Sequence, residues 1–275
     1  WTKVLMQNLT RKFMDGLSLH YYTVIDWRSK GSATSFSEKE YYNILSKAIE
    51  IEDVLRRHIE IMDQYDPQGR VDLLLDEWGT WFEVEPGTNP GHLYQQNTMR
   101  DAMVAALSFD IFHKYTRRLK MANIAQVVNV LQSMILTDET RMVLTPTYHV
   151  FEMYNVHQDA EYLSSDCIAA KTRCDRQISV PQVDVTASRK DGVTNISLVN
   201  TSLKDSAKVL VSFDSAKAFT KVSAARVLTS SDVHDFNDFD HPESVKPAEF
   251  KDYKFTKAGL EVILPPCSIV CISGK

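Results

Sequence analysis

Hydrophobic side chains in the first part of the chain follow two alternating periodicities. Apolar residues recur at helical spacing over residues 1–13, and an alternating run typical of a strand follows at 17–22. Ser37, with acidic residues just after it, then begins an apolar repeat of helical period that continues through residues 37–66. The pattern therefore predicts a helix, a strand and one long amphipathic helix.

Two further strands and another helix continue this alternation. Residues 71–78 form a short apolar run between glycines, and residues 86–91 are rich in Gly and Pro, which predicts a long loop. Residues 93–117 repeat apolar side chains at helical spacing, and residues 120–128 predict a third, buried strand. Strands separated by helices of this size indicate parallel βαβ units, whose functional side chains gather at the carboxyl ends of the strands.

From about residue 157 the pattern changes to short strands separated by polar turns. The strands we expect are residues 183–187, 194–199, 208–213, 224–228, 260–264 and 269–272. Such a series is typical of a β-sandwich. We therefore divide the chain into part of an α/β domain at residues 1–156 and an all-β domain at residues 157–275.

The number of βα units is too small for a closed barrel. Only three strands fit before the β-rich part, so roughly the first five units of a TIM (β/α)8 barrel would be missing. The chain also begins at Trp1 with neither an initiator Met nor the pattern of a signal peptide. We therefore expect it to begin inside a larger gene product.

Composition excludes several classes of protein. Of 275 residues, 44% are hydrophobic and 24% charged, which is enough to bury a core. No apolar run approaches the length of about 18 residues that a membrane span needs, so we expect no membrane association. Lys and Arg number 31 against 36 Asp and Glu, with no basic stripe, so nucleic acid is not an expected partner.

The cysteines and known short motifs give no sign of a metal or cofactor. Four cysteines, Cys167, Cys174, Cys267 and Cys271, are too few for a disulfide scaffold, and their spacing matches no standard zinc pattern. The chain has no serine-hydrolase elbow, phosphate-binding loop or dinucleotide fingerprint. We expect no metal and no cofactor, and the redox state of the cysteines stays open.

The strongest chemical signal is Glu77, at the end of the second predicted strand. Asp76 and Trp78 flank it, and Trp81 follows four positions later. Indole rings suit the apolar C–H faces of a sugar, and a carboxylate can attack or stabilise its anomeric carbon. The alternative is that Asp76 and Glu77 cap the loop while Trp78 fills the core.

Three other polar residues lie at predicted strand ends. His20 can hydrogen-bond a carboxylate and hold it ionised, and the Tyr22 hydroxyl can do the same for a nucleophile or a sugar hydroxyl. Gln126 carries an amide that can bind sugar hydroxyls. Each has a structural alternative, namely a histidine packed among tyrosines or an amide that satisfies loop backbone groups.

Four separated segments resemble, in order and spacing, the C-terminal portion of the α-L-arabinofuranosidases of glycoside hydrolase family 51. They are residues 16–22 (GLSLHYY), 75–78 (LDEW) with Trp81, 122–130 (ANIAQVVNV) and 264–270 (LPPCSIV). The resemblance spans nearly the whole chain. It implies a TIM barrel followed by a β-sandwich, with the three strands as the sixth, seventh and eighth of the barrel.

The resemblance also implies roles for single residues. Glu77 corresponds to the nucleophile, and His20 and Tyr22 to a pair that contacts the active-site carboxylates and the sugar. Trp81 corresponds to the wall of the arabinose pocket, and Gln126 to a sugar-binding amide.

The implied activity is that of a retaining exo-glycosidase. Such an enzyme removes terminal α-L-arabinofuranosyl groups from plant arabinan, arabinoxylan or oligosaccharides, and the resemblance implies a homo-oligomer in the full-length protein. The family's acid/base glutamate lies on the fourth strand, before the first residue of this chain, so we expect the isolated chain to be inactive. Asp26, Glu83 and Glu85 lie in loops and are weaker candidates for that acid.

Two alternatives to this activity stay open. The chain could be a non-catalytic carbohydrate-binding or assembly module, or part of a related glycosidase of other sugar specificity. Whether the protein is cytoplasmic, periplasmic or secreted also stays open.

Overall fold

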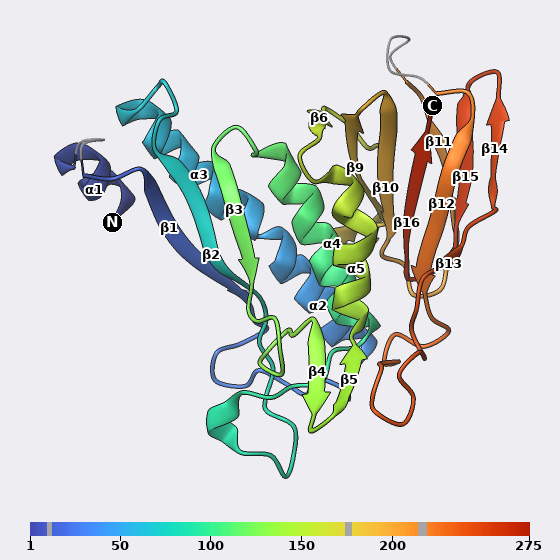
Figure 1. Ribbon diagram of the computed structural model, residues 1–275, viewed down its shortest axis with the longest axis horizontal. Coiled ribbons are helices and arrows are strands. Elements are labelled where there is room, and N and C mark those ends of the chain that lie inside the picture. The colour runs from blue at the N-terminus through green and yellow to red at the C-terminus, as the bar shows by residue number, and fades with distance from the viewer. Residues whose placement is uncertain (10–12, 174–177, 214–218) are drawn as a thin grey trace.

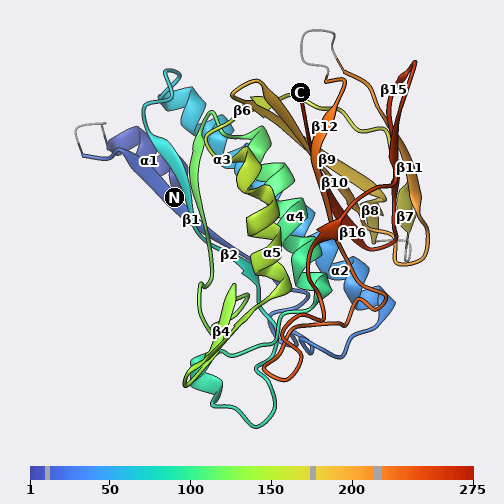
Figure 2. The same ribbon diagram turned by 45° about the vertical axis from the view of Figure 1, so that its right-hand side comes forward.

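The computed structural model describes residues 1–9, 13–173, 178–213 and 219–275. A parallel sheet with its helices comes first and antiparallel sheets follow, as the sequence predicts. Along the longest axis the parallel sheet, the helices and the antiparallel sheets lie side by side (Figure 1). The turned view in Figure 2 shows helices α4 (Met99–Lys114) and α5 (Pro146–Tyr154) between the two groups of strands.

The parallel sheet has three strands in the order β1-β2-β3. They are β1 (Gly16–Thr23), β2 (Asp72–Thr80) and β3 (Leu119–Ile124). The prediction of a buried third strand over residues 120–128 is wrong in two respects. β3 ends at Ile124, and most of its residues are exposed or half-buried, because only one face of the sheet is covered by helices.

The predicted long helix is two consecutive helices, α2 (Glu38–Ile49) and α3 (Ile51–Tyr65). Ser37 caps α2 through a capping box, in which its side chain accepts from the Glu40 N–H and the Glu40 side chain accepts from the Ser37 N–H. The helical hydrogen-bond pattern is interrupted at Glu50, although its backbone stays in the helical region. The two helices therefore follow one another along the same side of the sheet (Figure 1).

The remaining helices differ from the prediction mainly at their ends. α1 (Thr2–Asn8) is shorter than the expected helix, and residues 10–12 lie outside the described residues. α4 begins at Met99 rather than at residue 93, because Thr98 caps it and the preceding residues make other contacts. α5 was not predicted, although Thr145 caps it and Pro146 occupies its first position.

The second part of the chain contains all six predicted strands. A six-stranded antiparallel sheet has the order β13-β12-β16-β10-β9-β6, and a three-stranded one the order β11-β15-β14. Their bounds are β6 (Glu161–Leu163), β9 (Val183–Lys190), β10 (Val193–Asn200), β11 (Ala207–Val211), β12 (Val222–Thr229), β13 (Ala248–Glu249), β14 (Tyr253–Thr256), β15 (Gly259–Leu264) and β16 (Ser268–Gly274). Shorter unpredicted elements are the pairs β4–β5 (Ile135–Asp138, Arg141–Leu144) and β7–β8 (Lys171–Arg173, Ser179–Pro181) and the single turns η1 (Pro90–His92) and η2 (Asn155–His157).

One apolar core joins the two parts of the chain. α4 packs against β2 and also against β9, β10 and β16, while α5 packs against β12 and β16. The buried cluster accordingly includes Leu73 of β2 together with Leu228 and Ile269 of the six-stranded sheet. A second cluster of apolar side chains lies between the two antiparallel sheets. The division after residue 156 stays a prediction, since the core is continuous across it.

Two histidines are buried where the helices meet the six-stranded sheet. His113 of α4 lies 3.0 Å from the Thr186 hydroxyl, and His157 of η2 lies between the hydroxyls of Ser188 (2.7 Å) and Ser197 (2.8 Å). Burial lowers the pKa of His113 to about 4. Burial, and secondarily the neighbouring His113, lowers the pKa of His157 to about 3. Both imidazoles are therefore neutral in the native protein at neutral pH.

We expect these histidines to make the protein less stable in mild acid. Below the ordinary pKa of 6.5 the unfolded chain binds protons that the native chain does not bind until pH falls to about 4 or lower. The free energy of unfolding should therefore decrease as the pH decreases from about 6.5 to about 4, by up to about 1.4 kcal/mol per pH unit for each histidine. Above pH 6.5 the two histidines should not affect the pH dependence of stability.

Urea unfolding of the wild type and of His157→Asn across this window measures the effect. Burial raises the pKa of Asp110 and Asp184, and such carboxyl groups make the native protein more stable as the pH decreases, opposite to the histidines. Both carboxyl groups are present in wild type and variant, so their contribution cancels when the two stability curves are subtracted. The wild type should lose stability more steeply in acid than His157→Asn, and the exposed His92→Asn should behave like wild type. Equal slopes for wild type and His157→Asn would contradict the assignment.

Candidate active site at the strand ends

A β-bulge at Asp76 decides which way the candidate carboxylate points. Up to Leu75 the strands β1 and β2 pair residue for residue, and beyond it His20 pairs with Glu77, which leaves Asp76 as the extra residue. Regular alternation would place Glu77 on the same face as Leu75, which is buried against the helices. The bulge instead turns Glu77 to the open face and Trp78 to the helices.

Trp78 anchors this arrangement in the core. Its side chain is 2% exposed, and its ring lies 5.5 Å from Phe109 and 5.2 Å from Phe112 of α4, and 6.1 Å from Phe151 of α5, between centroids. Burial of an indole among three aromatic rings stabilises one orientation of the strand. The suggestion that Trp78 fills the core is therefore right, and this packing is what directs Glu77 away from the core.

Tyr22 and His20 surround the Glu77 carboxylate on the open face. Tyr22 donates its hydroxyl to Glu77 Oε2, and His20 Nδ1 lies 3.6 Å from the same oxygen. Burial, together with the hydrogen bond to Glu77 and the charge of Glu77, raises the pKa of Tyr22. The phenol therefore remains protonated and donating. Glu77 is still 42% exposed, so a ligand can reach its carboxylate.

Aromatic rings continue from Tyr22 away from the carboxylate. Trp81 meets Tyr22 edge to face at 4.9 Å between centroids, and Trp27 meets Trp81 in the same way at 5.8 Å. Lys30 Nζ lies 5.9 Å from the centroid of the Trp81 ring. We call Trp81, Trp27 and Lys30 the aromatic wall. Trp27 and Lys30 were missed in the sequence, although an indole five residues beyond Tyr22 in a strand-end loop was a usable signal.

Gln126 lies at the same edge of the sheet, two residues beyond β3. The preceding residue, Ala125, donates its N–H to the carbonyl of Trp78 at 2.9 Å, and Gln126 donates its own N–H to Val130 at 3.0 Å. The side chain of Gln126 is exposed. The structure thus gathers His20, Tyr22 and Trp81 near Glu77 and leaves Gln126 at the neighbouring strand end with its amide open to solvent.

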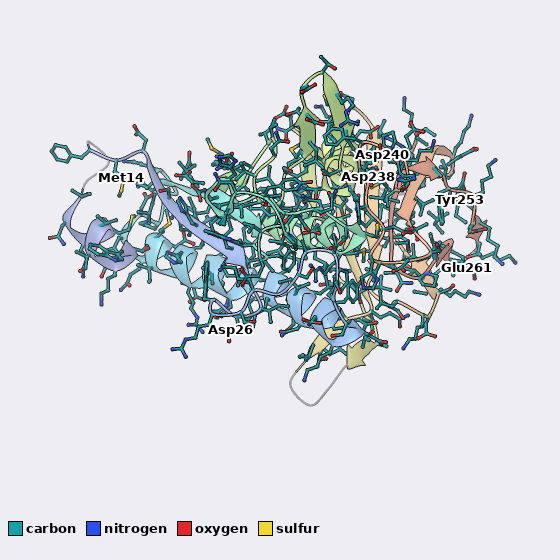
Figure 3. The ribbon with its side chains drawn as sticks, turned by 90° about the horizontal axis from the view of Figure 1, so that it is seen from below. Met14, Asp26, Asp238, Asp240, Tyr253 and Glu261 are labelled. Carbon is teal, nitrogen blue, oxygen red and sulfur yellow. The ribbon has the colours of Figure 1, made fainter. Side chains whose placement is uncertain are left out.

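The three loop carboxylates considered as the acid accept hydrogen bonds from backbone N–H groups. Asp26 accepts from Arg28 (2.7 Å), Glu83 from Lys30 (3.1 Å) and Glu85 from Gln96 (3.0 Å). Asp26 lies at the outer margin of the molecule in Figure 3. Each of the three carboxylates therefore stabilises its loops.

A buried polar network fixes the end of β2 to the first turn of α4. Asp101 accepts the hydroxyl of Thr80 at 2.5 Å, and its carbonyl accepts the side-chain amide of Gln132 at 2.8 Å. The Gln132 oxygen in turn accepts the Thr80 N–H at 2.7 Å. Burial raises the pKa of Asp101, which the charge of Arg100 opposes. Gly79, at φ 142°, has a backbone conformation that residues with a side chain rarely adopt, and a Cβ there would make a tight contact of 3.2 Å with the Gln132 oxygen.

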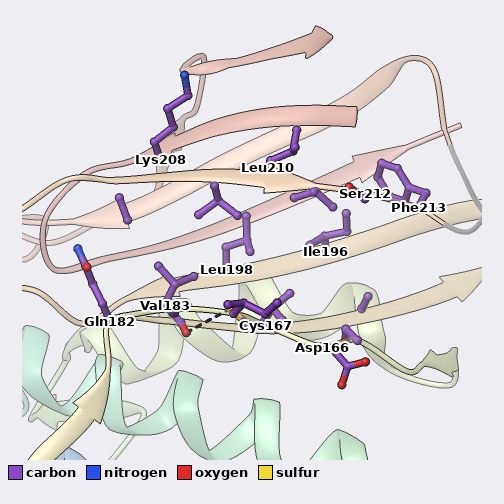
Figure 4. A pocket seen from close by; sticks show the side chains of 18 of the residues that line it. Asp166, Cys167, Gln182, Val183, Ile196, Leu198, Lys208, Leu210, Ser212 and Phe213 are labelled. Carbon is purple, nitrogen blue, oxygen red and sulfur yellow. Dashed lines mark hydrogen bonds between the residues drawn. The ribbon is translucent and has the colours of Figure 1, made fainter. Parts of the chain in front are cut away.

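A cavity of about 800 Å³ lies away from the strand ends, between the sheets of the second part. Figure 4 shows Ile196, Leu198 and Val183 facing into it, while Lys208 and Asp166 point away from it. Among the described residues that line it, Phe213 is the one aromatic. A sugar would therefore find a single flat ring to stack on in this part of the cavity.

Neither a metal-binding cluster nor a membrane-spanning helix occurs among the described residues. Within the described ranges, no three His, Cys, Asp or Glu side chains are grouped so that they could hold a metal ion. No helix of the described residues is long and apolar enough to cross a membrane. The chemistry available at the strand ends is therefore that of a carboxylate, a phenol, an imidazole and an aromatic wall.

Comparison with protein families gives a match over most of the chain. The profile of the family described as "Alpha-L-arabinofuranosidase C-terminal domain" matches residues 76–268. The chain is 54% identical over 274 residues to the intracellular exo-α-L-arabinofuranosidase of Bacteroides ovatus, which covers 99% of this chain and 53% of that protein.

Solved structures give the same picture. The family 51 arabinofuranosidase of Xanthomonas axonopodis pv. citri superposes on all of this chain with a TM-score of 0.96 at 42% identity, over 55% of its own length. The family 51 α-L-arabinofuranosidase of Bifidobacterium longum superposes with a TM-score of 0.84 at 19% identity, which shows the shared fold. The chain thus spans about half the length of these relatives.

Proposed function

The chain belongs to the α-L-arabinofuranosidases of glycoside hydrolase family 51, as their C-terminal region, and from this we propose that the full-length protein is a retaining exo-glycosidase. Its substrates are the terminal, non-reducing α-L-arabinofuranosyl groups of arabinan, arabinoxylan or arabino-oligosaccharides. The observation that carries the proposal is the bulge at Asp76, which places Glu77 on the open face, where it accepts the hydroxyl of Tyr22, whose ring contacts Trp81.

Glu77 acts as the nucleophile in this proposal. Its carboxylate attacks the anomeric carbon, the leaving oxygen departs with a proton from an acid, and water then hydrolyses the glycosyl-enzyme. The Tyr22 hydroxyl and His20 orient the attacking carboxylate through the contacts to Oε2. Trp81 packs against the sugar ring, and Gln126 binds a sugar hydroxyl.

The second half of the reaction centre comes from outside this chain. Retaining glycosidases need a second carboxyl group about 5 to 5.5 Å from the nucleophile. Asp26, Glu83 and Glu85 accept backbone N–H groups of the strand-end loops, which disfavours them for this role. We propose that the acid/base lies on the part of the barrel that precedes residues 1–156, and that the full-length enzyme is a homo-oligomer.

The two alternatives have less support. A carbohydrate-binding module needs aromatic platforms. Trp81 and Trp27 lie beside Tyr22, which donates to Glu77, whereas the cavity between the antiparallel sheets has Phe213 as the one aromatic among its described lining residues. Solved glucanases that superpose on the chain do so at 12–15% identity, which shows only a common fold. The arabinofuranosidase family profile, by contrast, matches a sequence segment that includes Glu77.

Replacing the proposed nucleophile should abolish turnover of the full-length enzyme. Glu77→Gln keeps the size of the side chain but removes the attacking charge. Loss of a nucleophile costs several orders of magnitude in rate, on the order of 5 kcal/mol or more of transition-state stabilisation. Hydrolysis of an aryl arabinofuranoside measures it. Glu83→Gln, which removes a nearby loop carboxylate, should lose less than about tenfold. An unchanged rate for Glu77→Gln would refute the role of Glu77.

The 275-residue chain alone should not turn over a natural arabino-oligosaccharide. Without a general acid the leaving group departs unprotonated, and general acid catalysis is worth about 10²- to 10⁴-fold. Any residual activity should appear with an activated aryl leaving group and stall at the glycosyl-enzyme. Product release by the purified chain, with Glu77→Gln as control, tests this. Steady Glu77-dependent turnover would show that the acid lies within these residues.

A further inference from the structure

Arg100, in the first turn of α4, is fully buried and takes no part in the proposed chemistry. Its guanidinium lies between two rings, 3.7 Å from the centroid of Phe36 and 3.8 Å from that of Phe82. It also donates to the carbonyls of Ser32 and Ala33, both at 3.1 Å. Burial lowers the pKa of Arg100 to about 10, so it carries its charge at neutral pH.

The groups that Arg100 contacts belong to the two loops that carry the aromatic wall. Ser32, Ala33 and Phe36 lie in the loop between β1 and α2, which also holds Trp27 and Lys30. Phe82 directly follows Trp81, at the end of β2. One guanidinium therefore holds both loops from their buried side.

The two loops are also joined to each other by backbone hydrogen bonds. Trp81 donates its N–H to the carbonyl of Thr23 at 3.2 Å, and Glu83 donates to that of Gly31 at 2.9 Å. A displacement of the β1–α2 loop would therefore move Trp81 as well as Trp27. Arg100 is the charged side chain at the centre of this arrangement, and its anchor is the first turn of a helix rather than a loop.

The second part of the chain holds the same loop from another direction. His234 packs 4.1 Å from Phe36 between ring centroids, and its Nε2 donates to the Phe36 carbonyl at 2.8 Å. The neighbouring Asp235 accepts the N–H of Met99, the first residue of α4, at 2.9 Å. The loop after β12 therefore fixes both Phe36 and the helix turn that carries Arg100.

We propose that Arg100 is a positioning residue that sets the spacing of the aromatic wall and so the affinity for the arabinofuranosyl substrate. The proposal rests on the function proposed above. Glu77 and Tyr22 lie on strands and do not touch Arg100, so loss of its contacts acts on sugar binding more than on the chemical step. Lysine keeps the charge but cannot stack a planar head between the rings of Phe36 and Phe82.

Arg100→Lys in the full-length enzyme tests this, with Arg118→Lys as its matched control. The Arg118 side chain is also buried, at 2% exposure, but it pairs with Asp63 and Asp66 near the opposite, amino end of the strands. With an aryl arabinofuranoside, Arg100→Lys should raise KM about tenfold and lower kcat less than about threefold. Arg118→Lys should lower thermal stability and leave KM within about twofold of wild type.

A double variant separates positioning from general destabilisation. Trp27→Ala alone should also raise KM, and Arg100→Lys should add little to it, because both changes disturb the same wall. Fully additive effects, or an equal change of KM in Arg100→Lys and Arg118→Lys, would overturn the proposal. If Arg100→Lys does not fold, Phe36→Leu replaces it as the test, because it removes one of the two rings that stack on Arg100. The same rise in KM is then expected, and an unchanged KM would overturn the proposal. Activity retained in Glu77→Gln would overturn the proposed function but not this proposal. A rise of KM in Arg100→Lys would then still show that Arg100 positions the groups that bind the ligand.

Discussion

Burial of Trp78 is the constraint from which the geometry of the site follows. The indole packs among Phe109, Phe112 and Phe151, on the helix side of the sheet. Because side chains alternate along a strand, the residue before Trp78 must face the other way. Because Asp76 is an extra residue in the strand, Trp78 and the buried leucines earlier in β2 can all face the helices. A packing requirement of the core thereby presents a carboxylate on the open face.

The first turn of α4 then collects the loops that follow all three parallel strands. Arg100 holds the loop after β1, Asp101 accepts from Thr80 at the end of β2, and the carbonyl of Asp101 accepts from Gln132 in the loop after β3. These partners are buried, so breaking any one of them leaves an unsatisfied polar group inside the protein. The loops of the site are thus tied to the buried first turn of α4. The β-rich part contributes through His234 and Asp235.

Much of the architecture could be predicted from the sequence, because it depends on local periodicity. The parallel strands, the cap at Ser37 and six strands of the second part follow apolar alternation and turn residues. The direction of Glu77 could not be predicted, since a continuous apolar run conceals a one-residue bulge. Arg100 was missed because an arginine at a helix start usually faces solvent, and Trp27 because a loop aromatic belongs to no repeat.

As the proposed nucleophile, Glu77 should form a covalent bond to the sugar. The most direct measurement is acid quenching of the full-length enzyme during turnover of an aryl arabinofuranoside, followed by peptide mass mapping. We expect a mass increment of one pentosyl group on the peptide that contains Glu77, and no increment in Glu77→Gln. A pentosyl group on another carboxylate, or none at any residue while product of inverted configuration accumulates, would rule out Glu77 as the nucleophile.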